Sequence, residues 1–268
     1  MAESTVNVLP EDCLSHVISF TCPRDACCSS IVSGMFRGAA DSDLTWDKFL
    51  PLDYREIISR SASPLDYASK KELFIKLCST PLLIDGGNKT FSLDKHTSKK
   101  CYMLSARELS ITWSTNSLCW CWKPYPSSRF REIAELIMVC RLEIRGKIDT
   151  MMLSPNTTYG AYLVIQITPR AFGLSVLPSE VSIEVGDYIT RGNFYMNREE
   201  CKRREFDTST EGEERVPCAR GDGWLEIELG EFYNNGSEKE VMMEFKEVKS
   251  EQLKGGLVVE GIEIRPKH

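Results

Sequence analysis

The sequence lacks the residues that several classes of function require. Its net charge is −6, with 33 Lys and Arg against 39 Asp and Glu, so it offers no overall basic surface for nonspecific binding to nucleic acid or to an anionic membrane. It has only three histidines, and its 11 cysteines include no Cys-x-x-Cys pair, the spacing typical of a structural zinc site. We therefore expect free thiols and neither a metal nor another cofactor.

Segments that target a chain to a membrane are also missing. The first 20 residues hold Glu3, Glu11 and Asp12 but no Lys or Arg, and they lack the basic and apolar regions of a signal peptide. No run of about 18 apolar residues occurs, so no transmembrane helix is expected. Together with the free thiols, these absences favour the cytoplasm or the nucleus.

Motifs of catalysis are absent as well. The sequence contains no Gly-x-Ser-x-Gly, no glycine-rich phosphate loop and no His–Glu metal pattern. Glu226 and Glu228 lie two residues apart on a predicted strand, so both face one side. Acid–base chemistry on a glycoside needs carboxylates that flank a cleft, so we interpret this pair as facing solvent and expect no catalytic residue.

Three of the five tryptophans, Trp113, Trp120 and Trp122, gather within residues 109–122. The start of this segment alternates like a strand, a polar break follows, and Trp120 and Trp122 then share one side of an extended stretch. Tryptophan offers a rigid apolar plate and one N–H donor, which suits the apolar face of a sugar ring. The alternative is a place in the core of a β-sandwich, and we expect this for Trp122 and Trp224.

The first 50 residues predict three short helical segments. Residues 8–20 start a helix at Pro10, residues 23–36 repeat apolar side chains at helical spacing, and residues 44–50 form a third apolar patch. Three such helices bury little surface on their own, so the unit needs a partner surface or a neighbouring domain.

These residues resemble an F-box over about residues 5–51. An F-box docks on a Skp-type adaptor, which links it to a cullin ubiquitin ligase. By this resemblance the adaptor-facing candidates are Leu9, Pro10, Ile18, Trp46, Phe49 and Leu50. The alternative, that such side chains only pack the helices together, stays open for Ile18 and for Ile31. An exposed Leu-Pro at the start of a helix has no obvious role in a core.

The remainder of the chain changes from helix to strand. In residues 52–100, a capping box of Ser69 and Glu72 predicts a helix, and two short strands follow at 82–84 and 89–93. Beyond residue 101 we expect one helix at 129–138, a charged mobile insertion at 197–221, and strands at 139–148, 159–168, 180–189, 224–232, 241–248 and 257–265. Many short strands separated by Gly-containing turns favour an antiparallel sandwich.

Residues 109–122, 222–234 and 261–266 resemble the phloem protein 2 family of plant lectins, also called Nictaba-related lectins, over about residues 103–266. The combined resemblance implies a multidomain α + β protein. Its parts would be a small all-α F-box at residues 1–51, a structured connector at 52–100 and a jelly-roll-like lectin β-sandwich at 101–268.

The resemblance also implies a sugar site at Trp113, Trp120, Glu231 and Glu238. Aromatic stacking with carboxylate acceptors would hold a neutral ligand such as an N-acetylglucosamine oligomer or an N-glycan core. The alternative for the two glutamates is an ordinary place in a solvated turn. Residues 115–119 depart from the family's Asp-Asn-Pro-x-Tyr, and losing that proline would loosen the loop that presents Trp120.

We therefore predict a substrate-recognition subunit of an SCF-type cullin ubiquitin ligase, whose β-sandwich recruits a glycan or glycoprotein. Its expected partners include neither nucleic acid nor a membrane. One alternative is a cytosolic or nuclear lectin without a ligase, which would bind sugar but form no stable adaptor complex. Another is a protein-binding module with a decayed sugar site, whose target binding would survive Trp120→Ala.

Overall fold

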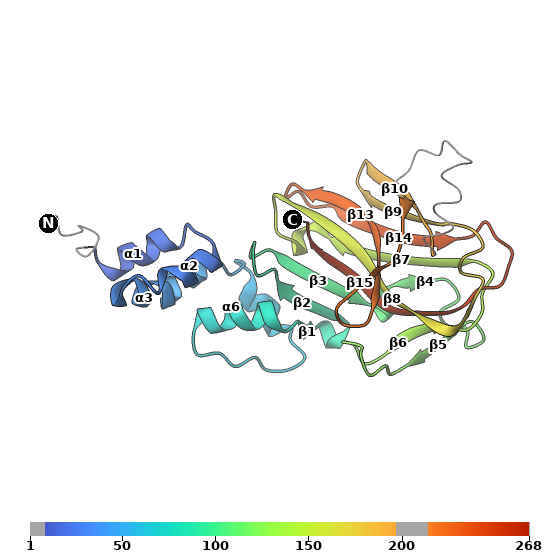
Figure 1. The fold of residues 1–268 in the computed structure, drawn as a ribbon, viewed down its shortest axis with the longest axis horizontal. Helices are drawn as coiled ribbons and strands as arrows, with labels where there is room; N and C mark the ends of the chain where they lie inside the picture. The colour runs from blue at the N-terminus through green and yellow to red at the C-terminus, as the bar shows by residue number, and fades with distance from the viewer. Residues whose placement is uncertain (1–8, 197–213, 268) are drawn as a thin grey trace. The chain divides into compact units, whose positions relative to one another are not determined.

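The computed structural model describes residues 9–196 and 214–267 (Figure 1). Contacts between residues divide the chain into two compact units. The helical unit comprises Met1–Gly86 and Phe91–Cys101, and the β unit comprises Gly87–Thr90 and Tyr102–His268. Most of the predicted charged insertion, residues 197–213, lies outside the described residues.

The helical unit contains α1 (Glu11–Ile18), α2 (Pro23–Ser29), α3 (Gly34–Asp41), α4 (Asp43–Asp47), α5 (Tyr54–Ser59) and α6 (Lys70–Ser79). The expected single helix over 23–36 is wrong, because α2 ends at Ser29 and α3 begins after Ser33. The Ser33 hydroxyl accepts a hydrogen bond from the backbone N–H of Phe36 at 3.3 Å, so a serine cap starts a new helix inside an apolar repeat.

The predicted capping box is confirmed at the start of α6. The Ser69 hydroxyl accepts from the backbone N–H of Glu72 at 3.2 Å, and the Glu72 carboxylate accepts from the N–H of Ala68 at 2.8 Å. α6 then places Phe74 against Trp46, with ring centroids 5.3 Å apart. The Trp46 indole donates to the Ala40 carbonyl at 2.7 Å, so the core of this unit is both apolar and hydrogen-bonded.

The strands form two sheets, as Figure 1 shows. The larger sheet has the order β1-β2-β3-β15-β8-β13-β12, and β6 pairs with both β15 and β5. Its strands are β1 (Leu82–Ile84), β2 (Lys89–Leu93), β3 (Lys100–Ser105), β5 (Trp120–Lys123), β6 (Ile133–Leu136), β8 (Thr157–Phe172), β12 (Cys218–Ala219), β13 (Leu225–Asn234) and β15 (Gly255–Pro266). β8 pairs with β13 on one side and β15 on the other, so it lies inside the sheet and not at an edge.

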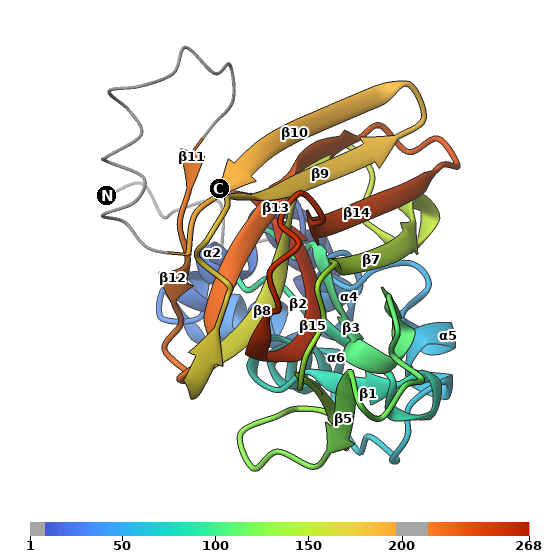
Figure 2. The same cartoon turned by 90° about the vertical axis from the view of Figure 1, so that its right-hand side faces the viewer.

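The smaller sheet has the order β11-β10-β9-β14-β7-β4. Its strands are β4 (Ser110–Ile111), β7 (Leu142–Asp149), β9 (Ser179–Val185), β10 (Tyr188–Phe194), β11 (Glu214–Arg215) and β14 (Glu240–Glu247). Burial alternates along β7, where Leu142, Ile144 and Ile148 face inward. A methyl group added at Gly146 would lie 2.8 Å from Ile262 of the larger sheet, so the inner faces of the two sheets meet here (Figure 2).

The predicted change from N-terminal helices to antiparallel strands is confirmed, but three local predictions are wrong. Residues 129–138 are not a helix, because 133–136 form β6, in which Leu136 pairs with Trp120. Residues 180–189 are not one strand, because Gly186 turns the chain with a φ of 59°. The strand-like alternation at the start of residues 109–122 gives only the two-residue strand β4, which ends at Ile111. Cross-strand pairing overrides helical spacing in 129–138, since a strand takes its stability from neighbours.

Candidate functional site

The tryptophan loop, residues 112–119 between β4 and β5, is held by two indole rings. Trp120 donates its indole N–H to the Thr112 carbonyl at 3.0 Å, and Trp122 donates its own to the Ser114 carbonyl at 2.9 Å. Both rings belong to β5, so one strand fixes both sides of Trp113.

Trp113 is presented to solvent by a strained backbone. Its side chain is 61% exposed, and its φ is 61°, in the left-handed region that bulky residues rarely adopt. Such conformations persist where the surroundings enforce them, and they cluster at functional sites. Leu118 on the same loop is also exposed, so the tryptophan loop carries an apolar tip.

The other tryptophans are not available in the same way. Trp120 is 2% exposed, so in this structure it packs as core and leaves no face for a sugar ring. The buried position expected for Trp224 is confirmed, and its indole donates to the Ser127 carbonyl at 3.1 Å. Trp122 is only partly buried, and the Arg107 guanidinium lies 3.7 Å from its ring centroid. Trp113 is thus the ring of this cluster that offers a free face.

The structure does not bring Glu231 and Glu238 to Trp113. The Thr112 N–H, next to Trp113, bonds to the Glu143 carbonyl near the start of β7. Glu238 lies in the turn before β14, where Glu240 pairs with Asp149 at the far end of β7. Those two points on β7 are about 20 Å apart at ~3.3 Å per residue.

Glu231 lies on β13 in the larger sheet, where it is exposed and pairs with Lys267 at 3.3 Å. Trp113 therefore lies in the loop after β4 and Glu238 in the turn before β14, next to opposite ends of β7, while Glu231 lies on a strand of the larger sheet. The four residues form no single cluster in this structure.

The predicted adaptor-facing residues divide by burial. Leu9 is 42% exposed and Pro10 is exposed, whereas Ile18, Trp46, Phe49 and Leu50 are each at most 6% exposed. The four buried side chains pack the helices on one another. Ile18 therefore packs inside the helical unit, as the alternative interpretation holds. Ile31 does not, because its side chain is 83% exposed.

Other apolar side chains of the helical unit are also exposed, which spacing along the sequence does not predict. Val17 (57%), Phe20 (76%) and Val32 (65%) join Ile31 on α1 and on the connections after α1 and α2. Spacing alone places Val17 in one apolar stripe with Leu14 and Ile18, because an eight-residue helix is too short for spacing to separate its faces. The helical unit thus exposes more apolar surface than its sequence suggested.

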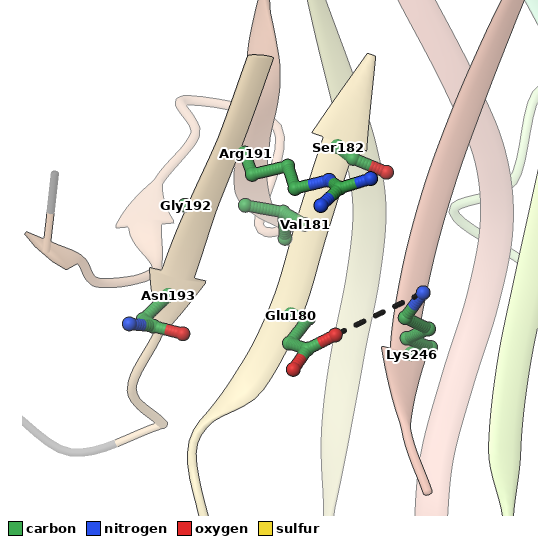
Figure 3. A pocket seen from close by; sticks show the side chains of 7 residues that line it. All are labelled: Glu180, Val181, Ser182, Arg191, Gly192, Asn193 and Lys246. Atoms are coloured by element: carbon green, nitrogen blue, oxygen red, sulfur yellow. Dashed lines mark ion pairs between the residues drawn. The ribbon is translucent and has the colours of Figure 1, made fainter. Parts of the chain in front are cut away.

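A charged trough of about 340 Å³ lies over β9, β10 and β14 (Figure 3). Lys246 approaches Glu180 at 3.8 Å and Glu244 at 2.7 Å. Arg191 extends from β10 toward Ser182 on β9, as Figure 3 shows. Among the described residues, the walls carry mainly charged and polar groups and no aromatic ring, so these residues provide no plate for stacking.

The two glutamates considered for acid–base chemistry are both engaged by cations. Glu226 accepts from Arg265 at 2.7 Å and from Arg220 at 2.9 Å, and Glu228 pairs with Lys267 at 3.0 Å. Burial raises the pKa of Glu226, but hydrogen bonds from the two arginines outweigh it and hold the pKa below its usual range. Within residues 9–196 and 214–267, no group of three or more His, Cys, Asp or Glu could hold a metal ion.

Comparison with known sequences finds the phloem protein 2 family profile over residues 99–266. The chain belongs to this family. F-box protein PP2-B15 of Arabidopsis thaliana is 46% identical, over 97% of this chain and 96% of that protein. F-box protein VBF of the same plant is 45% identical, over 97% and 99%, and F-box protein At2g02240 is 46% identical, over 98% and 81%. The resemblance to plant F-box proteins of the phloem protein 2 family is thereby confirmed.

The phloem protein 2 match starts just before β3 and ends with β15. It contains the tryptophan loop and both predicted glutamates, whereas the candidate adaptor residues precede it. Neither the family description nor the names of these relatives denotes an enzyme. No helix in the described part of the chain is long and apolar enough to cross a membrane.

Proposed function

We propose that this protein is the substrate-recognition subunit of an SCF-type cullin ubiquitin ligase. The helical unit acts as the F-box and docks on a Skp-type adaptor. The β unit, as a jelly-roll-like sandwich, binds a glycan or glycoprotein target in the cytoplasm or nucleus. The protein itself contributes recognition, and the ubiquitin transfer belongs to the complex.

The exposed apolar surface of the helical unit is the observation that supports docking. Its core is already filled by side chains such as Trp46 and Phe74, yet Phe20, Ile31 and Val32 remain largely exposed. Apolar side chains gathered on one small unit are typical of a surface that another protein covers. Leu9 and Pro10, exposed at the start of α1, extend the same apolar character.

A binding measurement between the full chain and a plant Skp-type adaptor tests this proposal. Phe20→Ala combined with Ile31→Ala should weaken adaptor binding by about tenfold or more, because exposed aromatic and aliphatic anchors dominate interface energies. Leu253→Ala, which truncates a 49% exposed apolar side chain of the β unit, is the matched control. Unchanged affinity in the double variant would show that the adaptor docks elsewhere.

The burial of Trp120 favours a second candidate, a protein-binding module whose sugar site has decayed. The family resemblance assigns both Trp113 and Trp120 to sugar stacking, but because Trp120 is buried, only Trp113 is exposed to a ligand. A glycan array probed with the full chain, together with the adaptor-binding measurement, separates three candidate functions. Binding to N-acetylglucosamine oligomers or N-glycan cores supports the glycan receptor, and sugar binding without an adaptor complex supports a lectin that acts without a ligase. Absence of any sugar binding supports the protein-binding module.

A further inference from the structure

A second cavity, of about 280 Å³, opens at one end of the β unit, between the β9–β10 turn and the β13–β14 turn. Each sheet contributes one aromatic ring to it, because Tyr188 begins β10 and Tyr233 lies near the end of β13. We call it the tyrosine pocket. The other lining residues are Thr150, Val185, Asn234, Asn235 and Lys239. The volume is close to the lower end of the range for small-molecule sites, roughly 300 Å³, which suits one sugar ring.

The floor of the tyrosine pocket is built from groups whose hydrogen bonds are satisfied internally. Asn234 is 1% exposed, and its amide donates to the carbonyls of Thr150 at 3.0 Å and Ser154 at 3.1 Å. The Thr150 hydroxyl accepts from the Lys239 N–H at 2.9 Å. A floor held in this way keeps its shape without a ligand, which lowers the cost of binding one.

The rim, by contrast, carries groups with unused binding capacity. Tyr188 is 51% exposed and Tyr233 is 58% exposed. Within the described parts of the chain, the Tyr188 hydroxyl, the Asn235 amide nitrogen and the Lys239 ammonium have no hydrogen bond or ion pair. The Tyr233 hydroxyl has one long contact, 3.4 Å from the Asn156 side chain. The rim therefore combines two apolar ring faces with polar groups that can still form hydrogen bonds to a ligand.

The chemistry of the rim indicates which ligand fits. Two phenol rings offer stacking faces with hydroxyls at their edges. The Asn235 amide and the Lys239 ammonium add hydrogen-bond donors beside these rings. Donors next to aromatic faces match a polyhydroxylated ring.

We propose that the tyrosine pocket, not the tryptophan loop, binds a sugar ring of the target glycan. This inference rests on the proposed glycan-binding function of the β unit. Glu238, a predicted sugar contact, lies far from Trp113 along β7 and directly precedes Lys239, which lines the tyrosine pocket.

The test uses the full chain and the glycan-array member that the wild-type protein binds most tightly, titrated by calorimetry. Tyr188→Ala and Tyr233→Ala should each weaken binding by about tenfold, as loss of a stacking ring predicts, whereas Trp113→Ala should leave it within about twofold. Tyr188→Phe and Tyr233→Phe keep the rings and control for folding. Tyr67→Ala removes a 40% exposed tyrosine from the helical unit and should change nothing.

The outcomes separate the two proposals. Wild-type binding that Trp113→Ala abolishes, and that both tyrosine-to-alanine variants retain, would overturn the pocket but leave the glycan function intact. Wild-type protein that binds no array member would overturn both. Loss of binding in the alanine variants, with thermal unfolding midpoints unchanged, is the result that the tyrosine pocket predicts.

Discussion

At Trp113 the backbone and the side chain have opposite effects on stability. A φ of 61° in a bulky residue costs roughly 1–3 kcal/mol, while the 61% exposed indole returns little burial energy. Trp113→Gly should therefore leave the free energy of unfolding unchanged or raise it by up to about 1 kcal/mol. Urea unfolding followed by circular dichroism measures this free energy. If Trp113→Gly lowered it by more than about 1 kcal/mol, the indole would be shown to support the fold.

Trp120 is the matched comparison, because it lies on the same segment with the opposite burial. Its ring is 2% exposed and its N–H is hydrogen-bonded to Thr112. Trp120→Ala should lower the free energy of unfolding by about 3–5 kcal/mol, the usual cost of removing a buried tryptophan. Equal effects of the two substitutions would contradict the distinction drawn here between a presented ring and a core ring.

Glu260 is a buried carboxyl group with an unsatisfied oxygen. It is 0% exposed in a bulge of β15, where Oε1 accepts from the Arg129 N–H at 2.7 Å. Oε2 has no hydrogen-bond partner in the described parts of the chain. Burial raises the pKa of Glu260 above its ordinary value, because the carboxylate form is desolvated.

This raised pKa predicts a pH-dependent stability. The folded state holds the proton more tightly than the unfolded state, so stability is lost as pH rises from the ordinary glutamate pKa through the folded pKa. Glu260→Gln stays neutral, and its free energy of unfolding should exceed that of wild type by on the order of 1 kcal/mol at about pH 8, with a smaller difference at about pH 5. Urea titrations at the two pH values measure it, and a difference independent of pH would refute the ionisation argument.

At the scale of elements, a single serine divides the helix expected over residues 23–36. Ser33→Ala removes the side chain that caps α3 and should destabilise the helical unit by about 1 kcal/mol. Ser30→Ala is the control, because the Ser30 hydroxyl donates to the Cys27 carbonyl at 2.7 Å and caps no helix start. Thermal unfolding followed at the helix band compares them, and equal midpoints for the two variants would argue against capping at Ser33.

The individual helices and strands also show which parts of the fold the sequence predicts and why it does not predict the others. Local signals such as the Ser69 capping box and the apolar run of β8 predict their elements, because the residues that decide them are adjacent in the chain. The sequence does not predict β6, because this strand forms only by pairing with other strands. It pairs with β5 and with Val258 and Val259 of β15, which come more than 120 residues later in the chain. The burial of Trp120 and the tyrosine pocket likewise depend on contacts between distant segments, which spacing along one strand does not show.

At the scale of the whole molecule, the family match and the compact units have different boundaries. The match begins at residue 99, whereas the β unit also includes Gly87–Thr90. The Asn88 carbonyl accepts from the Ser105 N–H at 2.9 Å, and Lys89 pairs with Glu108 at 3.2 Å. Residues 87–90, which lie before the match and include the first two residues of β2, thus belong to the same compact unit as the matched domain.

A fragment of residues 99–268 loses β2 and leaves β3 as an unpaired edge, which lowers stability and promotes association. We expect its β signal to unfold at a lower temperature than in the full chain, and a fragment of residues 87–268, which keeps the contacts of Asn88 and Lys89, to unfold between the two. Circular dichroism with light scattering measures both midpoint and aggregation. Identical midpoints for the full chain and residues 99–268 would mean that β2 contributes nothing to the β unit. If the three midpoints follow this order, the fragment of residues 99–268 is a destabilised domain, and its sugar binding would not represent that of the protein. Glycan specificity therefore has to be measured on the full chain.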